Sequence, residues 1–352
     1  MNNVIEFNDG TRIGADQPVY IIAEVGVNHN GDLELAKRLI RAAARCGADC
    51  VKFQTFKAQR VVTKSAPKAA YQLKTTNQDE SQEQMLKKLE MSMDAYREII
   101  NCCKENDVLF MSTPYSVEDV DFLEKLGVSA YKLASMHVVE PWFACYVAKT
   151  KKPIILSTGM ATIDEVELVV SAMRKTDNEQ LILLQCTTNY PSRLEDANLF
   201  SMQTLKDKFD LIVGYSDHTN DDIACIVSIG LGAKVIEKHF TLDKSMEGPD
   251  QSTSATPEEF SHLVKAIRSA ELVLGSPIKE PCAIEKENMI GMRRSIVAKK
   301  DIKKGETINE ESLTFKRPAT GLKPKHFDNL MGQMAVRDIA IDELVKWEDF
   351  SY

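Results

Sequence analysis

The chain has 352 residues, 43% hydrophobic and 27% charged, a composition typical of a folded globular protein and not of a disordered one. Its 44 basic and 52 acidic side chains give a formal net charge of −8, which excludes a general nucleic-acid binder, because such a protein needs a basic face. No secretory signal and no apolar stretch long enough for a membrane span occurs, and the eight cysteines form no CxxC pair, so we expect a cytoplasmic protein with reduced thiols.

Short apolar runs rich in Val, Ile and Leu recur eight times, with stretches of helical periodicity between them. Continuous apolar runs are typical of parallel strands that are covered on both faces. Asp32 stands where it would cap the first helix. The predicted strands are residues 19–25, 51–54, 108–112, 131–134, 153–157, 181–185, 211–215 and 235–239, and the predicted helices include 33–46, 117–126, 164–173 and 222–231.

This alternation predicts an α/β fold, a TIM (β/α)8 barrel that fills residues 1–275. One doubly wound sheet is the alternative, but eight units and the absence of a GxGxxG sequence favour the barrel. Residues 66–93 are the longest interruption and are rich in Gln, Lys and Glu. We expect them to form an extra loop and helix over the mouth of the barrel.

The pattern stops after Leu274. Residues 276–290 contain Pro277 and Pro281 and predict a turn-rich linker. Residues 291–352 carry short β-like runs separated by turns and predict a small, separate, mostly β domain. The basic run at 293–304 includes Asp301 and no aromatic residue, which indicates a solvated surface rather than a nucleic-acid site.

Polar residues gather where the predicted strands end, which is where TIM barrels carry their chemistry. Residues two apart on a strand share a face, so Lys52 and Gln54 point to the same side, as do Glu237 and His239. Buried lysines need anionic partners. Two lysines near several hydroxyls therefore predict a site for phosphate and carboxylate, and internal ion pairs with Glu24 and Glu237 are the alternative. The residues of this set are Lys52, Lys132, Ser135, Ser157 and Ser216.

His218 and His239 lie at the ends of neighbouring predicted strands and could approach one another. Two imidazoles with water and a carboxylate such as Asp250 or Glu24 would leave open positions on a divalent metal. This arrangement favours Mn²⁺ or Mg²⁺ over a closed zinc site, with Mn²⁺ as the first expectation. A hydrogen-bonded role for each histidine is the alternative.

Several motifs in order resemble the sialic acid synthase family, which makes N-acetylneuraminate or legionaminate. They are residues 24–31 (EVGVNHNG), 52–54 (KFQ), 112–114 (STP), 157–160 (STGM), 214–219 (GYSDHT) and 237–243 (EKHFTLD). The tail, with residues 298–306 and 316–321, is similar to the antifreeze-like (SAF) domain of that family. The resemblance covers nearly the whole chain.

The resemblance implies a metal-dependent condensation of phosphoenolpyruvate, water and an N-acylated amino sugar in its open aldehyde form, with release of phosphate. N-acetylmannosamine, giving N-acetylneuraminate, is the first expectation. A 2,4-diacetamido-2,4,6-trideoxymannose, giving legionaminic acid, or another nonulosonic acid is the alternative, and residues 71–77 with 80–82 are similar to such relatives. The resemblance also implies a domain-swapped homodimer.

The resemblance further implies a role for each residue that matches a motif. Phosphoenolpyruvate would contact Lys52, Lys132, Ser135, Ser157, Ser216 and either Thr188 or Asn189, because some relatives carry Asn where this chain has Thr188. Gln54, Tyr190 and Asp250 would contact the sugar, and Arg317 would reach its acylamino group from the second subunit. His218 and His239 would bind the metal. Glu24, Glu237 and Lys52 would be catalytic, and either carboxylate could move the proton of the water.

Two other functions remain open at this level. A silent scaffold or an ice-binding protein with the same fold would have no reason to keep Lys52, Lys132, His218, His239 and Glu237 together. A barrel synthase that uses a phosphorylated sugar would need a further Arg or Lys cluster at the mouth, and none stands beside these motifs.

Overall fold

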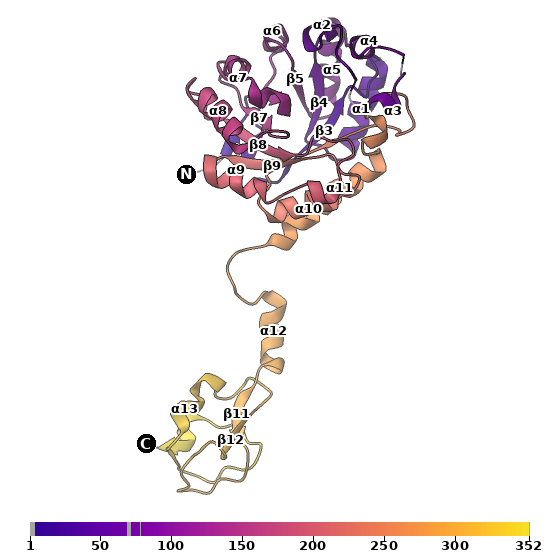
Figure 1. Cartoon of the computed structure of the whole chain (residues 1–352). Helices are drawn as coiled ribbons and strands as arrows, with labels where there is room; N and C mark the ends of the chain where they lie inside the picture. The colour runs from indigo at the N-terminus through magenta and orange to yellow at the C-terminus, as the bar shows by residue number, and fades with distance from the viewer. Residues whose placement is uncertain (1–3, 69–71, 78, 352) are drawn as a thin grey trace. The chain divides into compact units, whose positions relative to one another are not determined.

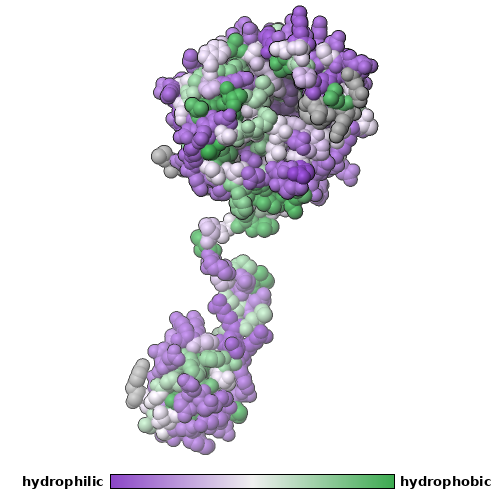
Figure 2. All heavy atoms as spheres, in the orientation of Figure 1, coloured by the Kyte–Doolittle hydropathy of each residue, from purple (hydrophilic) through white to green (hydrophobic). Residues whose placement is uncertain are grey.

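The computed structural model describes residues 4–68, 72–77 and 79–351, which form two compact units, Met1–Gly275 and Ser276–Tyr352. Tyr71, the first residue of the range 71–77 given above, lies outside the described residues, as does the last residue of the tail. No helix in the described part of the chain is both long and apolar enough to cross a membrane. Hydrophilic residues cover most of the face seen in Figure 2, with hydrophobic ones in smaller groups.

Eight parallel strands form the first unit, and helices surround them (Figure 1). The strand order is β5-β4-β3-β10-β9-β8-β7-β6, and β5 contacts β6, so the sheet curves into a nearly closed barrel. The predicted TIM-type fold is confirmed. The strands are β3 (Tyr20–Gly26), β4 (Cys50–Thr55), β5 (Leu109–Pro114), β6 (Tyr131–Leu133), β7 (Ile154–Ser157), β8 (Leu181–Cys186), β9 (Ile212–Asp217) and β10 (Val235–His239).

The outer helices pack apolar faces on the strands, and most begin at a capping side chain. Asp32 accepts hydrogen bonds from the backbone N–H groups of Glu34 and Leu35, so its predicted cap is confirmed. The outer helices are α1 (Leu33–Arg45), α5 (Met93–Glu105), α6 (Val117–Leu126), α7 (Pro141–Ala148), α8 (Ile163–Arg174), α9 (Ser201–Phe209), α10 (Ile223–Gly230) and α11 (Pro257–Leu274).

The inward face of the strands changes from apolar to polar along the barrel axis. One apolar layer contains Ile22, Cys50, Met111, Ala130, Ile155 and Val235 in a single core cluster. Because inward positions recur every second residue, the next layer toward the carboxyl ends is Glu24, Lys52, Thr113, Lys132, Ser157 and Glu237, and all six line one cavity. The fold therefore places a layer that contains ionisable side chains directly next to this apolar layer, on the side of the carboxyl ends of the strands.

An N-terminal hairpin, β1 (Val4–Glu6) with β2 (Arg12–Gly14), pairs antiparallel before the barrel begins. Its buried side chains Ile5, Phe7 and Ile13 belong to the same core cluster as the inward residues of the barrel strands. The hairpin therefore covers the end of the barrel opposite the strand ends that carry polar residues.

The interruption after β4 contains short helices that reach the mouth of the barrel. They are α2 (Ala58–Val61), α3 (Gln72–Thr75) and α4 (Gln82–Lys88). Ser81 caps α4 by accepting from the backbone N–H of Gln84. Met85 and Leu86 of α4 line the cavity, so the insertion forms part of its wall.

The second unit differs from the expected linker at its start. Residues 276–290 are predicted to be turn-rich, but α12 (Ala283–Met292) occupies most of them. The turn-forming residues Pro277 and Pro281 lie before this helix, and the residues that follow Cys282 are mostly good helix formers. The remaining domain is small and mostly β, as predicted, with Ile296, Leu313 and Val345 in its core. Its elements are β11 (Ser295–Ala298), β12 (Leu313–Lys316), α13 (Phe327–Leu330), β13 (Met334–Ala335) and β14 (Phe350–Ser351).

Candidate active site

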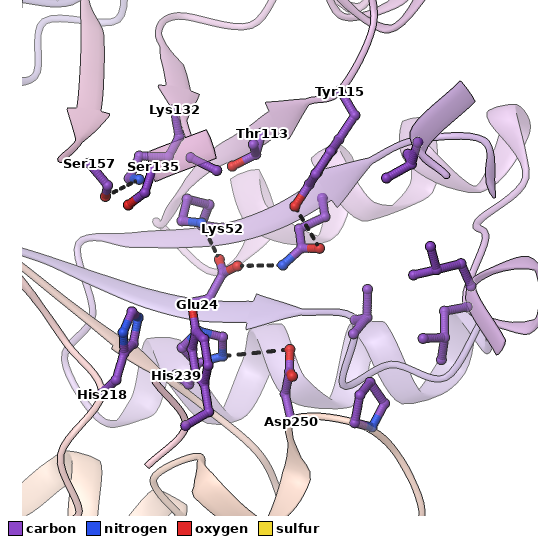
Figure 3. Close-up of a pocket in the computed structure, with 18 of the residues that line it drawn as sticks. Glu24, Lys52, Thr113, Tyr115, Lys132, Ser135, Ser157, His218, His239 and Asp250 are labelled. Atoms are coloured by element: carbon purple, nitrogen blue, oxygen red, sulfur yellow. Dashed lines mark hydrogen bonds and ion pairs between the residues drawn. The ribbon is translucent and has the colours of Figure 1, made fainter. Parts of the chain in front are cut away.

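A cavity of about 250 Å³ opens where the barrel strands end, and Figure 3 shows the side chains that point into it. Twelve of the predicted site residues line it together, from seven strands and the loops that follow them. They are Glu24, Lys52, Gln54, Lys132, Ser135, Ser157, Tyr190, Ser216, His218, Glu237, His239 and Asp250.

Two buried lysines and two buried carboxylates form the centre of the site. Lys52 Nζ lies 2.7 Å from Glu24 Oε2 and 3.7 Å from Glu237 Oε2. Lys132 Nζ lies 3.8 Å from Glu237 Oε1 and donates to Ser157 Oγ at 2.6 Å. The internal ion pairs considered as the alternative are therefore present, but their side chains still face the cavity.

Burial and neighbouring charges separate the protonation states of these groups. Burial alone would raise the pKa of Glu237, but the charges of Lys132 and Lys52 outweigh it and hold this pKa well below its usual range. Burial raises the pKa of Glu24, although Lys52 opposes the shift. Burial lowers the pKa of Lys132, whereas the charges of Glu237 and Glu24 raise that of Lys52 against its own burial.

Ser135, Gly159 and Cys186 lie close together beside Lys132 and Ser157, and we call these three residues the cradle. Ser135 Oγ accepts a hydrogen bond from the backbone N–H of Gly159 at 2.9 Å and lies 3.1 Å from Cys186 Sγ. A Cβ on Gly159 would stand 2.7 Å from Cys186 Sγ and 2.9 Å from Ser135 Oγ, with Thr188 Oγ1 nearer still. Ammonium, hydroxyl and amide donors that converge in this way suit a phosphate or carboxylate group.

A chain of hydrogen bonds orients Glu24 at the other side of the cavity. Gln54 Nε2 donates to Glu24 Oε1 at 3.1 Å, and Tyr115 OH donates to Gln54 Oε1 at 3.2 Å (Figure 3). The tyrosine thereby fixes which way the amide of Gln54 faces. Asp250 completes this side, and burial, followed by the charge of Glu24, raises its pKa to about 7.

His218 and His239 approach one another, with ring centroids 5.4 Å apart. His218 Nδ1 donates to the carbonyl oxygen of Thr187 at 2.7 Å, which leaves Nε2 with a lone pair. His239 Nδ1 is buried and has no hydrogen-bond partner among the described residues, and Asp250 Oδ2 lies 3.9 Å from it. Burial lowers the pKa of both imidazoles, so both are neutral and able to ligate a metal.

These donors fit a divalent ion with open positions better than a closed site. The described residues contain no group of three or more His, Cys, Asp or Glu side chains arranged around a metal position. Two imidazoles would therefore share the ion with water and substrate oxygen atoms, as in octahedral sites.

Three predicted site residues do not line this cavity. Thr188 is exposed, although its Oγ1 lies close to Gly159 next to Cys186 and Ser135. Asn189 uses its side-chain amide to donate to the carbonyl of Pro191 within its own turn. Arg317 belongs to the second unit, is exposed and donates through Nε to the carbonyl of Met292. Their roles remain predictions.

Five cavity residues with polar or thiol side chains are absent from the predicted set: Thr113, Tyr115, Cys186, Gln72 and Gln82. Two of them follow the alternation of their strands, since Thr113 is two residues after Met111 and Cys186 is two after Leu184. The other three lie beyond strand ends or in the insertion, where no periodicity signals which side chain faces inward.

Comparison with known proteins confirms the family resemblance of both parts of the chain. Residues 39–279 match the NeuB family and residues 293–351 match the SAF domain. The N,N'-diacetyllegionaminic acid synthase of Campylobacter jejuni is 47% identical over 93% of this chain and 98% of its own length, and that of Legionella pneumophila is 42% identical over 95% of each chain. The crystal structure of N-acetylneuraminic acid synthetase from Leptospira borgpetersenii in complex with citrate is 32% identical, has a TM-score of 0.72, and covers 82% of this chain and 96% of its own.

Proposed function

This chain belongs to the NeuB family and carries a C-terminal SAF domain, so it is a phosphoenolpyruvate-dependent nonulosonic acid synthase, and we propose that its sugar substrate is a 2,4-diacetamido-2,4,6-trideoxymannose. The enzyme would then be an N,N'-diacetyllegionaminic acid synthase. The observation that carries this choice is the 47% identity, over 98% of its length, with a relative of that name.

The first expectation, N-acetylmannosamine, has weaker support. The solved synthetase named for N-acetylneuraminic acid is only 32% identical to this chain. The acceptor side of the cavity also suits a diacetamido, deoxy sugar. The insertion contributes two amide side chains, Gln72 and Gln82, together with the apolar side chains of Met85 and Leu86. Amides pair with acetamido groups, and apolar side chains accommodate the acetamido methyl groups and the C6 methyl group.

For phosphoenolpyruvate we propose the side of the cavity that holds Lys52, Lys132, Ser135, Ser157 and Ser216. This substrate is a trianion near neutral pH, so it needs fixed cations and oriented donors. Lys132 and Ser157 are already hydrogen-bonded to one another at 2.6 Å, and both are buried. Preorganised donors of this kind lose little entropy when an anion binds.

Enzymes of this family generally depend on a metal ion, and we propose His218 and His239 as the protein ligands, with Mn²⁺ as the first choice and Mg²⁺ as the alternative. The ion would act as a Lewis acid on the aldehyde oxygen of the sugar. The proposal rests on the free lone pair of His218 and the unpartnered nitrogen of His239.

In the proposed reaction, C3 of phosphoenolpyruvate forms a bond to the aldehyde carbon, and the aldehyde oxygen takes up a proton and becomes a hydroxyl. A water adds to C2 with loss of a proton, and cleavage of the bond between C2 and the phosphate oxygen releases inorganic phosphate and leaves a ketone. Glu24 suits the proton transfers, because its carboxyl group faces the cavity and its raised pKa makes the carboxylate a stronger proton acceptor. Glu237, held as a carboxylate by two lysines, would keep Lys52 and Lys132 in place.

Three further parts of the proposal rest on the resemblance and on composition. A domain-swapped homodimer would bring Arg317 to the acylamino group of the sugar in the other subunit. Thr188 or Asn189 would complete the phosphate contacts after a small movement of its loop. A cytoplasmic location agrees with eight cysteines that are all free.

A panel of acceptor sugars tests the substrate. With phosphoenolpyruvate and Mn²⁺, we expect phosphate release to be fastest with the 2,4-diacetamido sugar, and at least about tenfold slower with N-acetylmannosamine, a ratio equal to about 1.4 kcal/mol. A Lys132→Met variant serves as the control that should release no phosphate with either sugar. Equal or faster turnover of N-acetylmannosamine would overturn the acceptor assignment and leave the reaction class intact.

A further inference from the structure

Two buried residues on the outer face of the barrel connect the strands that carry the histidines. Lys238 lies between Glu237 and His239 on β10, and Asp217 lies between Ser216 and His218 at the end of β9. Because side chains alternate, these two point away from the cavity while their neighbours point into it. Lys238 and Asp217 are register partners in the ladder of β9 and β10, as are Glu237 and Ser216.

Their contact is short and almost fully enclosed. Lys238 Nζ lies 2.5 Å from Asp217 Oδ2, and the side chains are 7% and 0% exposed. Asp217 accepts four further hydrogen bonds, from the backbone N–H and the hydroxyl of Thr219, from the hydroxyl of Tyr215 and from the thiol of Cys225. In a buried ion pair with this many additional hydrogen bonds, both the carboxylate and the ammonium have their hydrogen-bonding capacity filled, and such a pair is rigid.

The remaining donors of Lys238 reach past the end of the ladder. Lys238 Nζ donates to the carbonyl oxygens of Thr219 at 2.9 Å and Asp221 at 2.8 Å. The ladder between β9 and β10 ends at Asp217, so it does not hold the backbone of His218 against β10. The ammonium group of Lys238, on the same strand as His239, therefore contacts the chain both before and after His218.

We infer that Lys238 and Asp217 are positioning residues that set the distance and orientation between the imidazoles of His218 and His239. The inference rests on the metal site proposed above. The carbonyl oxygen of Thr187, in the loop after β8, fixes the ring of His218 from the other side. This hydrogen bond does not set the position of His239. Lys238 precedes His239 on β10 and contacts the residues on both sides of His218, whereas Tyr190 packs on the two rings themselves, with centroid distances of 4.3 Å to His218 and 5.5 Å to His239.

The test measures the affinity for Mn²⁺ by titration calorimetry on the full chain, without sugar and without turnover. Lys238→Met removes the ammonium and keeps most of the side-chain length. Lys238→Met/Asp217→Asn also removes the carboxylate that would otherwise be left buried and unpaired, so it protects the fold. We expect the Mn²⁺ dissociation constant to rise about 10- to 100-fold in both variants, the range typical of groups that orient metal ligands.

Matched measurements separate positioning from a general loss of structure. Phosphoenolpyruvate binding in the absence of metal should stay within about twofold of wild type, because Lys52, Lys132 and Ser157 are unchanged. Lys152→Met, which breaks a 2.5 Å ion pair with Glu124 before β7, should leave the Mn²⁺ affinity unchanged.

Two results would overturn the inference in distinguishable ways. If the double variant is folded and binds Mn²⁺ as tightly as wild type, the positioning role is wrong and the metal site stands. If wild type does not bind Mn²⁺, or His218→Ala binds it normally, the proposed metal site itself is wrong and the inference falls with it.

Discussion

Gly159 offers a sharp test of the cradle beside Lys132, because one methyl group there would meet three side chains at once. Its φ lies outside the left-handed region, so Gly159→Ala imposes no backbone strain and its effect is purely steric. The new Cβ would lie 2.7 Å from Cys186 Sγ and 2.9 Å from Ser135 Oγ, and closer still to Thr188 Oγ1. Ordinary contacts between such atoms exceed 3.4 Å.

Overpacking of this kind costs about 1–3 kcal/mol. If the cradle holds the phosphate, this cost falls on bound phosphoenolpyruvate, and kcat/KM for phosphoenolpyruvate should fall about 5- to 150-fold. The KM for the sugar should change less than about twofold. Steady-state phosphate release with each substrate varied in turn measures both quantities.

Gly230→Ala is the matched control, because nothing lies within 4 Å of its added methyl group and it lies in α10. That variant should keep its activity and gain up to about 1 kcal/mol in stability. Wild-type kcat/KM for phosphoenolpyruvate in Gly159→Ala would refute the reasoning, since it would mean that the phosphate binds elsewhere or that the cradle is loose.

Three further predictions concern the rest of the cavity. Tyr115→Phe removes the donor to Gln54 and should raise the KM for the sugar about 2- to 12-fold, with that for phosphoenolpyruvate unchanged; equal changes in both would contradict the separation of the two subsites. Glu237→Gln should lower the free energy of unfolding by about 3–5 kcal/mol at pH 7, because two buried lysines lose their shared anion. The pKa of the Glu237 carboxyl is lowered in the folded protein, so its stabilisation is complete at pH values above the usual pKa of a glutamate and decreases as the pH falls. Urea unfolding at pH 7 and pH 3.5 should therefore show a smaller difference in free energy of unfolding between wild type and variant at pH 3.5. Chelation of metal should abolish condensation and leave phosphoenolpyruvate binding within about threefold, as measured by equilibrium dialysis, and retained turnover would exclude the metal role.

Strand periodicity made most of the barrel and half of the site predictable. The pairs Lys52 with Gln54 and Glu237 with His239 could be assigned to one cavity, because the alternation along a strand is strict and the apolar residues before them identify the inward face. The same rule applied to Met111 and Leu184 would have added Thr113 and Cys186.

Residues outside regular elements could not be placed in this way. Tyr115 follows Pro114 at the end of β5, and its direction depends on its contact with Gln54, which no local pattern encodes. Asn189 was one of two candidates for the phosphate site, yet its amide is used within its own turn. The helix α12 was missed because Pro277 and Pro281 dominate the local signal, although the ten residues after Cys282 favour a helix.

The hairpin β1–β2 has a kinetic consequence. Its side chains Ile5, Phe7 and Ile13 cover the far end of the barrel, so substrates share the entrance at the mouth. The proposed phosphoenolpyruvate groups Lys132 and Ser157 stand directly above the apolar layer, whereas the insertion forms part of the wall at the mouth. A sugar seated first would therefore block the path of phosphoenolpyruvate. Binding should be ordered, with phosphoenolpyruvate first, and excess sugar should inhibit by trapping the enzyme without its partner substrate.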